Sequence, residues 1–203
     1  MEHDASALPA LLAVDARRHF RRVVEAYQHQ LYTFAYRLTS NQQMAEDIVQ
    51  EAFVRAYVAC VAYAPERVRA LKLRPWLYKI TLNEFYHAVR GARLHVMPLD
   101  LSEESPILEI QDAEGERPDF LVERRERLQE IEAALLQMPE RYRVPILCLY
   151  FEHLSYRETA DLLDQPLGSV KSAVFRGTRL LQTLLATEGK EGEPWSRKTA
   201  NRK

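Results

Sequence analysis

The stretch that decides the fold is LSYRETADLLDQPLGSVKSAVFRGTRLLQTLL, residues 154–185. Ser155 and Glu158 have the spacing of a capping box, which predicts that a helix begins there. Its apolar positions should face inward: Thr159, Ala160, Leu162 and Leu163. The turn Asp164-Gln165-Pro166 should end this short helix. A longer helix then follows.

The longer helix carries two different faces. Its inward stripe should be Leu167, Val170, Val174, Gly177, Leu181 and Leu184. Its polar face should be Ser169, Lys171, Ser172, Arg176 and Arg179. A short helix, a tight turn and a basic-faced second helix predict a helix-turn-helix, whose second helix would enter a DNA major groove. An ordinary helical hairpin is the alternative.

Two more helices precede this motif. Residues 121–138 have apolar residues at helical spacing and are closed by Pro139, and a second helix should run over residues 140–151. Pro145 lies inside that second helix. Because proline lacks an N–H, we expect a kink there.

The N-terminal part reads as a helical bundle. Apolar residues at steps of three and four predict a helix over residues 20–38. Ser40 and Gln43 match a second capping box, and the following helix should bury Met44, Ile48, Val49, Ala52 and Ala56. Its opposite face carries Glu46, Asp47, Gln50 and Glu51. We expect Asp47 to be exposed and dispensable for folding.

A third N-terminal helix should begin at Pro75 and end near Gly91. Basic residues alternate there with Trp76, Asn83 and Tyr86. This mixture suits single-stranded nucleic acid, since cations follow phosphates and aromatic rings stack on bases. The alternative is a helix with buried aromatic residues and solvated charges.

The charges are separated along the chain, although the formal net charge is only −1. Residues 65–93 hold seven basic residues and two acids, a net of +5, whereas residues 96–132 hold twelve acids and four arginines, a net of −8. Blocks of one sign suggest that different segments meet different partners. A solvated face followed by an acidic linker is the simpler alternative.

The composition also excludes several classes of protein. Six glycines in 203 residues and 47% hydrophobic residues favour helices over turn-rich β folds and disorder. No apolar run is long enough to span a membrane, the acidic N-terminal stretch is a poor secretory signal, and Cys60 and Cys148 should be buried thiols, so we expect a cytoplasmic protein. No nucleophile, phosphate-loop or metal-ligand motif is present. We therefore expect no catalytic residue, no metal and no cofactor.

Taken together, LYTFAYRLTSNQQMAEDIVQEAFVRAY, RPWLYKITLNEFYH and the 154–185 motif resemble a bacterial RNA polymerase sigma factor of the extracytoplasmic-function (ECF) type. The resemblance covers roughly residues 20–185 in the family's order. It implies an all-α fold of two small domains joined by an acidic linker. The expected boundaries are 1–95 for region 2, 96–120 for the linker, 121–186 for region 4 and 187–203 for a disordered tail.

The resemblance also implies a role for each surface. Glu46, Asp47, Gln50 and Glu51 would bind core RNA polymerase. The minus-10 element of promoter DNA, duplex and then melted, would be bound by Lys72, Arg74, Trp76, Lys79, Asn83, Tyr86 and Arg90. The minus-35 element would be bound by Ser169, Lys171, Ser172, Phe175, Arg176 and Arg179. An anti-sigma factor is a further expected partner.

Three positions depart from the family's pattern. Asp164 stands where glycine is frequent, so it must tolerate a left-handed backbone. Ala173 stands where a basic residue is common, so one phosphate contact should be missing. Gly177 stands where alanine is usual, which costs a helix about 1 kcal/mol.

Within the minus-35 set, Arg176 and Lys171 should do different work. The Arg176 fork matches guanine and should read a base, whereas Lys171 should make a phosphate or mixed contact. A stand-alone helix-turn-helix regulator is the alternative function, but it leaves the two N-terminal surfaces without a task. An enzyme is a third possibility and has no motif in its favour.

Overall fold

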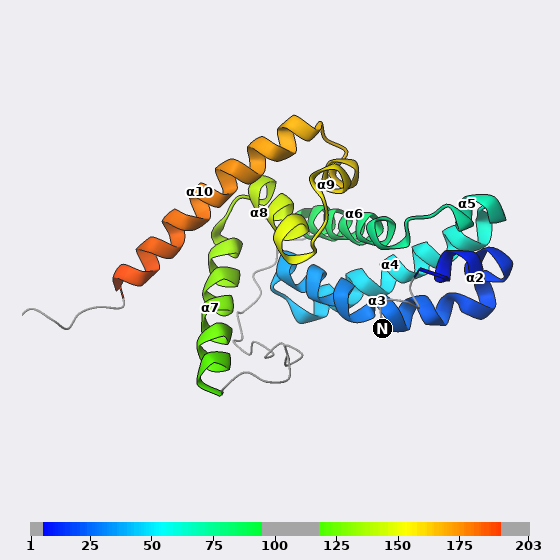
Figure 1. Cartoon of the computed structure of the whole chain (residues 1–203), viewed down its shortest axis with the longest axis horizontal. Coiled ribbons are helices and arrows are strands. Elements are labelled where there is room, and N and C mark those ends of the chain that lie inside the picture. Colours follow the sequence, from blue (N-terminus) through cyan, green and yellow to red (C-terminus); the bar gives the residue numbers. More distant parts are fainter. Residues whose placement is uncertain (1–5, 95–117, 192–203) are drawn as a thin grey trace, which may run out of the picture.

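The computed structural model describes residues 6–94 and 118–191. Within those ranges every regular element is a helix, as expected for the all-α class. The elements are α2 (Leu8–Val14), α3 (Ala16–Thr39), α4 (Gln42–Ala62), α5 (Pro65–Arg69), α6 (Leu73–Leu94), α7 (Pro118–Gln137), α8 (Glu140–Ile146), a π-helical turn (Leu147–Phe151), α9 (Tyr156–Leu163) and α10 (Leu167–Glu191). We call α2–α6 the N-terminal unit and α7–α10 the C-terminal unit (Figure 1).

The long helices α3 and α4 pack side by side and meet at a tight connection. The predicted inward residues of α3 are buried, with Val24 half-buried. The capping box predicted at Ser40 is wrong, because Ser40 ends α3 in a left-handed conformation (φ 50°). Asn41, whose backbone is extended, caps α4 instead and accepts a hydrogen bond from the Met44 N–H at 2.8 Å.

Helix α6 is longer than predicted at both ends. It begins at Leu73, so Pro75 occupies its third position, where the missing N–H has no partner within the helix in any case. It continues through Gly91 to Leu94, so Gly91 is not its cap. Its buried face includes Leu77 and Phe85, as predicted.

The C-terminal unit begins earlier than the sequence predicted. Helix α7 begins at Pro118, a favoured first helical position, so the last three residues assigned to the linker are helical. Residues 96–117 of that linker lie outside the described residues. Pro145 ends regular α-helical hydrogen bonding as expected: α8 stops at Ile146 and the wider π-helical turn follows.

The helix-turn-helix is present. Ser155 and Glu158 form both bonds of the predicted capping box. Asp164 adopts the expected left-handed backbone (φ 54°) at the end of α9. Leu167 is 38% exposed, so its predicted inward position is wrong; it begins α10 beside the turn, before the helix reaches the core.

Helix α10 also continues past its predicted end. It reaches Glu191. The next proline along the chain is Pro194, so no proline interrupts the helix before that residue. The disordered tail predicted from residue 187 is therefore wrong for its first five residues. Residues 192–203 lie outside the described part of the chain.

The two units pack against each other. Their buried apolar residues form one continuous cluster that runs from Phe34 and Leu77 in the N-terminal unit to Leu147 and Leu162 in the C-terminal unit. Helix α9 lies against α6, while α10 projects away from the N-terminal unit (Figure 1). Among the described residues, no helix is both long and apolar enough to cross a membrane.

Candidate nucleic-acid and polymerase interfaces

The acidic face of α4 points to solvent. Asp47, Gln50 and Glu51 are exposed and Glu46 is half-buried, while Ile48 and Val49 point into the core. The prediction that Asp47 faces outward is thus confirmed. Its carboxylate accepts a hydrogen bond from the Gln43 amide at 3.1 Å and forms no ion pair with a described side chain. A basic partner can therefore pair with it without breaking a contact inside the core.

The same face continues as a row of valines, which the sequence reasoning missed. Val54, Val58 and Val61 are 56%, 59% and 43% exposed. With Asp47 and Glu51 they follow steps of four, three, four and three, the spacing of a coiled-coil seam. An exposed apolar row at this spacing fits a partner helix. The absence of these valines from the inward stripe was the signal available in the sequence.

The residues predicted to bind minus-10 DNA do not share one open surface. Lys72, Asn83 and Arg90 are exposed. Trp76 is half-buried against the core, with its ring centroid 6.5 Å from that of Tyr63. Trp76 therefore helps to hold α6 against the core, and only part of its side chain is accessible.

The other three predicted residues of α6 contact the C-terminal unit. The Lys79 ammonium donates to the Leu162 and Asp161 carbonyl oxygens at 2.5 and 3.4 Å, at the end of α9, where a cation is favoured. The Arg74 guanidinium donates to the Glu152 carbonyl oxygen at 2.6 Å. Burial and the nearby Glu140 raise the pKa of Tyr86 to about 12. This arrangement covers part of the predicted minus-10 surface.

Glu152 lies at the centre of the contact between the two units. The Tyr78 hydroxyl donates to one of its carboxylate oxygens, and the Arg37 guanidinium lies 3.5 Å from the other. The same guanidinium donates to Glu132 at 2.9 Å and sits 4.6 Å from the centroid of the Phe151 ring. Burial raises the pKa of the Glu152 carboxyl, although Tyr78, Arg37 and Arg74 oppose that shift.

Sequence reasoning missed this cluster entirely. Glu152 and Tyr78 are 74 residues apart, and no local pattern pairs them. The buried Glu84 on α6 was missed as well; it pairs with Arg55 of α4 at 2.8 Å.

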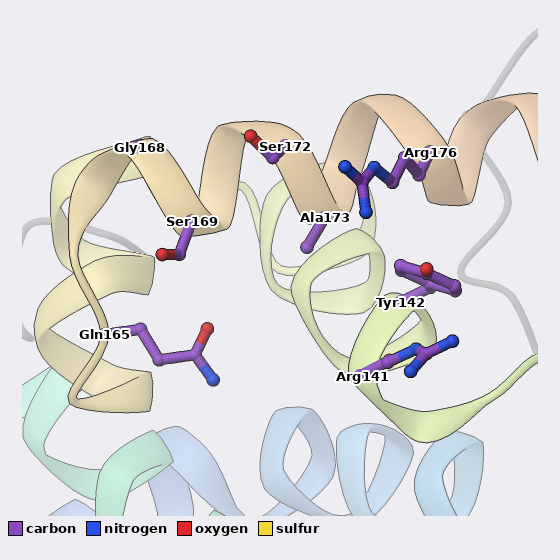
Figure 2. Close-up of a pocket in the computed structure, with 8 residues that line it drawn as sticks. All are labelled: Arg141, Tyr142, Gln165, Gly168, Ser169, Ser172, Ala173 and Arg176. Carbon is purple, nitrogen blue, oxygen red and sulfur yellow. The ribbon is translucent and has the colours of Figure 1, made fainter.

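The predicted minus-35 residues share one exposed face of α10. Ser169, Lys171, Ser172, Phe175, Arg176 and Arg179 are all exposed. Phe175 is 64% exposed, and the Arg179 guanidinium lies 5.5 Å from the centroid of its ring. An open cavity of about 480 Å³ adjoins this face and is lined by residues of α8, of the α9–α10 turn and of α10 (Figure 2).

The cysteines behave as the sequence predicted. Cys60 and Cys148 are both buried and free. Burial raises the pKa of Cys60 to about 11 and that of Cys148 to about 12, so neither thiol is activated. Among the described residues, no group of three or more His, Cys, Asp or Glu side chains is arranged to hold a metal ion.

Two family models match the chain, and each match falls within one of the two units. Residues 23–94 match sigma-70 region 2, and residues 128–181 match sigma-70 region 4. A stand-alone helix-turn-helix regulator would not contain sigma-70 region 2, so the first match argues against that alternative.

Known relatives agree with these matches. The ECF RNA polymerase sigma factor SigW of Bacillus subtilis is 30% identical over 169 residues, which cover 82% of this chain and 88% of that protein. SigM of the same organism is 27% identical over 162 residues, covering 80% and 92%. The solved sigma factor RpoE of Bartonella quintana, in complex with the anti-sigma factor NepR, has a TM-score of 0.62 and 25% identity over 83% of this chain and 98% of its own. With the fold, the matched regions and these relatives in agreement, the chain belongs to the ECF family of RNA polymerase sigma factors.

Proposed function

We propose that this sigma factor directs core RNA polymerase to promoters through three separate surfaces. The exposed face of α4 docks on the polymerase, α6 binds the minus-10 element as it melts, and the exposed face of α10 reads the minus-35 element in duplex DNA. The domains expected at residues 1–95 and 121–186 carry these tasks. The observation that most supports the proposal is the match of region 2 and region 4 to the two units that hold these surfaces.

The polymerase surface combines charge and apolar area. Asp47 and Glu51 supply carboxylates, and Val54, Val58 and Val61 extend the row by two helical turns. A partner helix that is basic at one end and apolar at the other fits this row. Carboxylates steer the encounter and fix the register, whereas the valines supply buried area.

The DNA surfaces differ in what they offer. Helix α10 presents hydroxyls, two arginines and a lysine, which match base edges and phosphates of a duplex. Helix α6 carries exposed Asn83 two helical turns from the half-buried Trp76, with exposed Lys72 and Arg90 before and along the helix, a combination that suits unstacked bases. Because Lys79 and Arg74 contact the C-terminal unit, use of the whole minus-10 surface requires that the two units separate.

The proposed function also includes a regulatory partner and a cellular location. RpoE is solved with the anti-sigma factor NepR, and we propose that a protein of that kind also holds this chain. The chain acts in the cytoplasm, where polymerase and promoter DNA are found, and performs no chemical reaction of its own.

Replacing Asp47 tests the docking surface. We expect Asp47→Ala to fold normally, because its carboxylate is exposed, and to bind core polymerase about tenfold more weakly. Titration of labelled chain with core polymerase measures the affinity. Glu25→Ala is the matched control, since it removes the same charge from an exposed position on α3. Equal affinity of the Asp47 variant and the parent would remove α4 from the docking surface.

Replacing Asn83 tests base reading during melting. We expect Asn83→Ala to bind core polymerase normally and to open promoters about tenfold more slowly. The measurement is the rate of promoter opening by holoenzyme at saturating concentration. Gln28→Ala, which removes an exposed amide from α3, is the control. An Asn83 variant that opens promoters at the parent's rate shows that the amide reads no base.

A further inference from the structure

The cavity beside α10 has walls from two helices. Arg141 stands on the α8 wall, and Arg176 stands on the α10 wall (Figure 2). Gln165 enters from the turn between α9 and α10, Ala173 lies on the α10 wall, and Tyr142 lies between the two arginines. Because the Ala173 side chain is a single methyl group, it fills little of the cavity between α10 and α8.

The charge of this cavity is uncompensated. Among the described residues, its lining contains two guanidinium groups and no carboxylate. Arg141 lies 4.8 Å from the centroid of the Tyr142 ring, and neither it nor Arg176 forms an ion pair with a described carboxylate. Arg21, Arg37 and Arg55 all have such partners. An anion is therefore the ligand that the cavity favours.

The remaining polar groups suit an oxyanion. The hydroxyls of Ser169 and Ser172 and the amide of Gln165 line the same cavity. All three side chains are exposed and accept or donate no hydrogen bond to a described residue. A phosphodiester carries one negative charge and accepts several hydrogen bonds, so it matches one guanidinium and a few neutral donors.

The position of the cavity points to duplex DNA as the source of that phosphate. The cavity opens on the side of α10 that carries Ser169, Ser172 and Arg176, and Arg141 lines it from α8. A helix in the major groove is flanked by the two phosphate backbones. A cation on a neighbouring helix therefore lies closer to the backbone phosphates than to the base edges.

We propose that Arg141 holds a backbone phosphate of the minus-35 duplex in the cavity beside Ala173. This inference rests on the proposed function of α10. Arg141 thereby supplies, from another helix, the phosphate contact that the sequence predicted to be missing at Ala173. Arg176 on the opposite wall keeps the base-reading task.

The test measures the salt dependence of binding. Holoenzyme reconstituted with the full chain first selects promoter fragments from random duplex DNA, and the affinity for a selected fragment is then measured between about 50 and 200 mM salt. Arg141→Ala should bind about tenfold more weakly at the lower salt and should lower the salt slope by about one. Its preference among base sequences should not change. Arg21→Ala, an exposed arginine on α3, should match the parent.

A charge relocation makes the test specific to the cavity. Adding Ala173→Arg to the Arg141→Ala chain should restore both affinity and slope, because the new guanidinium enters the same space. An unchanged slope in Arg141→Ala, a changed base preference or a failure of the relocation would each overturn the inference. If the parent holoenzyme selects no promoter, the proposed function itself fails, and that result is distinct.

Inorganic phosphate separates DNA from a free anion. At constant ionic strength, replacing chloride by inorganic phosphate should affect parent and Arg141→Ala binding equally, because the site needs the DNA backbone around it. Selective competition in the parent would identify a site for small anions and would overturn the assignment to duplex DNA.

Discussion

Replacing Arg37 by alanine should destabilise the fold by about 2–3 kcal/mol. Its guanidinium serves two carboxylates, Glu132 and the buried Glu152, and also covers the Phe151 ring. Without it, Tyr78 is the one described side chain that still hydrogen-bonds to the Glu152 carboxylate. A buried carboxylate that loses its nearest cation is costly, since the low-dielectric interior does not replace that cation with water. The free energy of unfolding in denaturant measures the loss.

Arg21→Ala is the matched control for this prediction. Arg21 also pairs with a glutamate, Glu25, but its side chain is 88% exposed. Exposed pairs of this kind contribute about 0–1 kcal/mol. Arg37→Lys should fall between the two, because an ammonium keeps the charge but cannot hold both carboxylates in the same fork geometry. If Arg37→Ala and Arg21→Ala lose the same small amount, the Glu152 cluster does not hold the units together.

The second large effect is expected at Gly177, where α10 crosses α8. A Cβ atom at this position would lie 2.7 Å from the end of the Ile146 side chain and 3.2 Å from the Tyr142 Cβ atom. Glycine lowers the stability of the helix at this position, as expected from the sequence, but its missing side chain lets α8 and α10 approach closely. Gly177→Leu should lose about 1–3 kcal/mol or more, because the helices must move apart. It should also weaken minus-35 binding, since Arg141 and Arg176 stand on those two helices.

Gly168 provides the control on the same helix. A Cβ atom there would meet nothing within 4 Å. Gly168→Ala should therefore be neutral or stabilise the chain by up to about 1 kcal/mol through helix propensity. Gly177→Ala should lie near zero, as the gain in propensity offsets a small displacement of Ile146. Thermal unfolding of Gly177→Leu, Gly177→Ala, Gly168→Leu and Gly168→Ala gives the order of their stabilities. A Gly177→Leu chain as stable as Gly168→Leu would show that α8 and α10 are not in close contact.

Local signals predicted much of this fold. The periodicity of α3 and α4 placed their buried faces correctly, and the Ser155–Glu158 capping box located the start of α9 to the residue. Errors arose where two signals compete within one or two residues. Ser40 and Asn41 are both good caps, and the sequence does not show that the first ends α3 while the second begins α4. The short helices α2 and α5 were not predicted, because five to seven residues carry too little periodicity.

The candidate site likewise has a part that the sequence predicts and a part that it does not. Exposure of Asp47 and of the α10 face follows from helical spacing, so the sequence was sufficient. The contact of Lys79 with α9 and the Glu152 cluster join residues 74 to 115 positions apart. Such pairs depend on how the two units pack, which no local pattern contains. Arg141 was missed for that reason too, because its place beside Ala173 exists only when α8 and α10 cross.

The most direct test of the account is promoter opening by a reconstituted system. Core polymerase alone, the chain alone and the two together are incubated with a selected promoter fragment, and unpaired thymines are detected by their reactivity to permanganate. The account predicts reactivity at the minus-10 element only when both are present, with loss of the signal in Asp47→Ala at limiting polymerase. Specific binding of the chain alone, with no opening when core polymerase is added, would contradict the account and favour a stand-alone regulator.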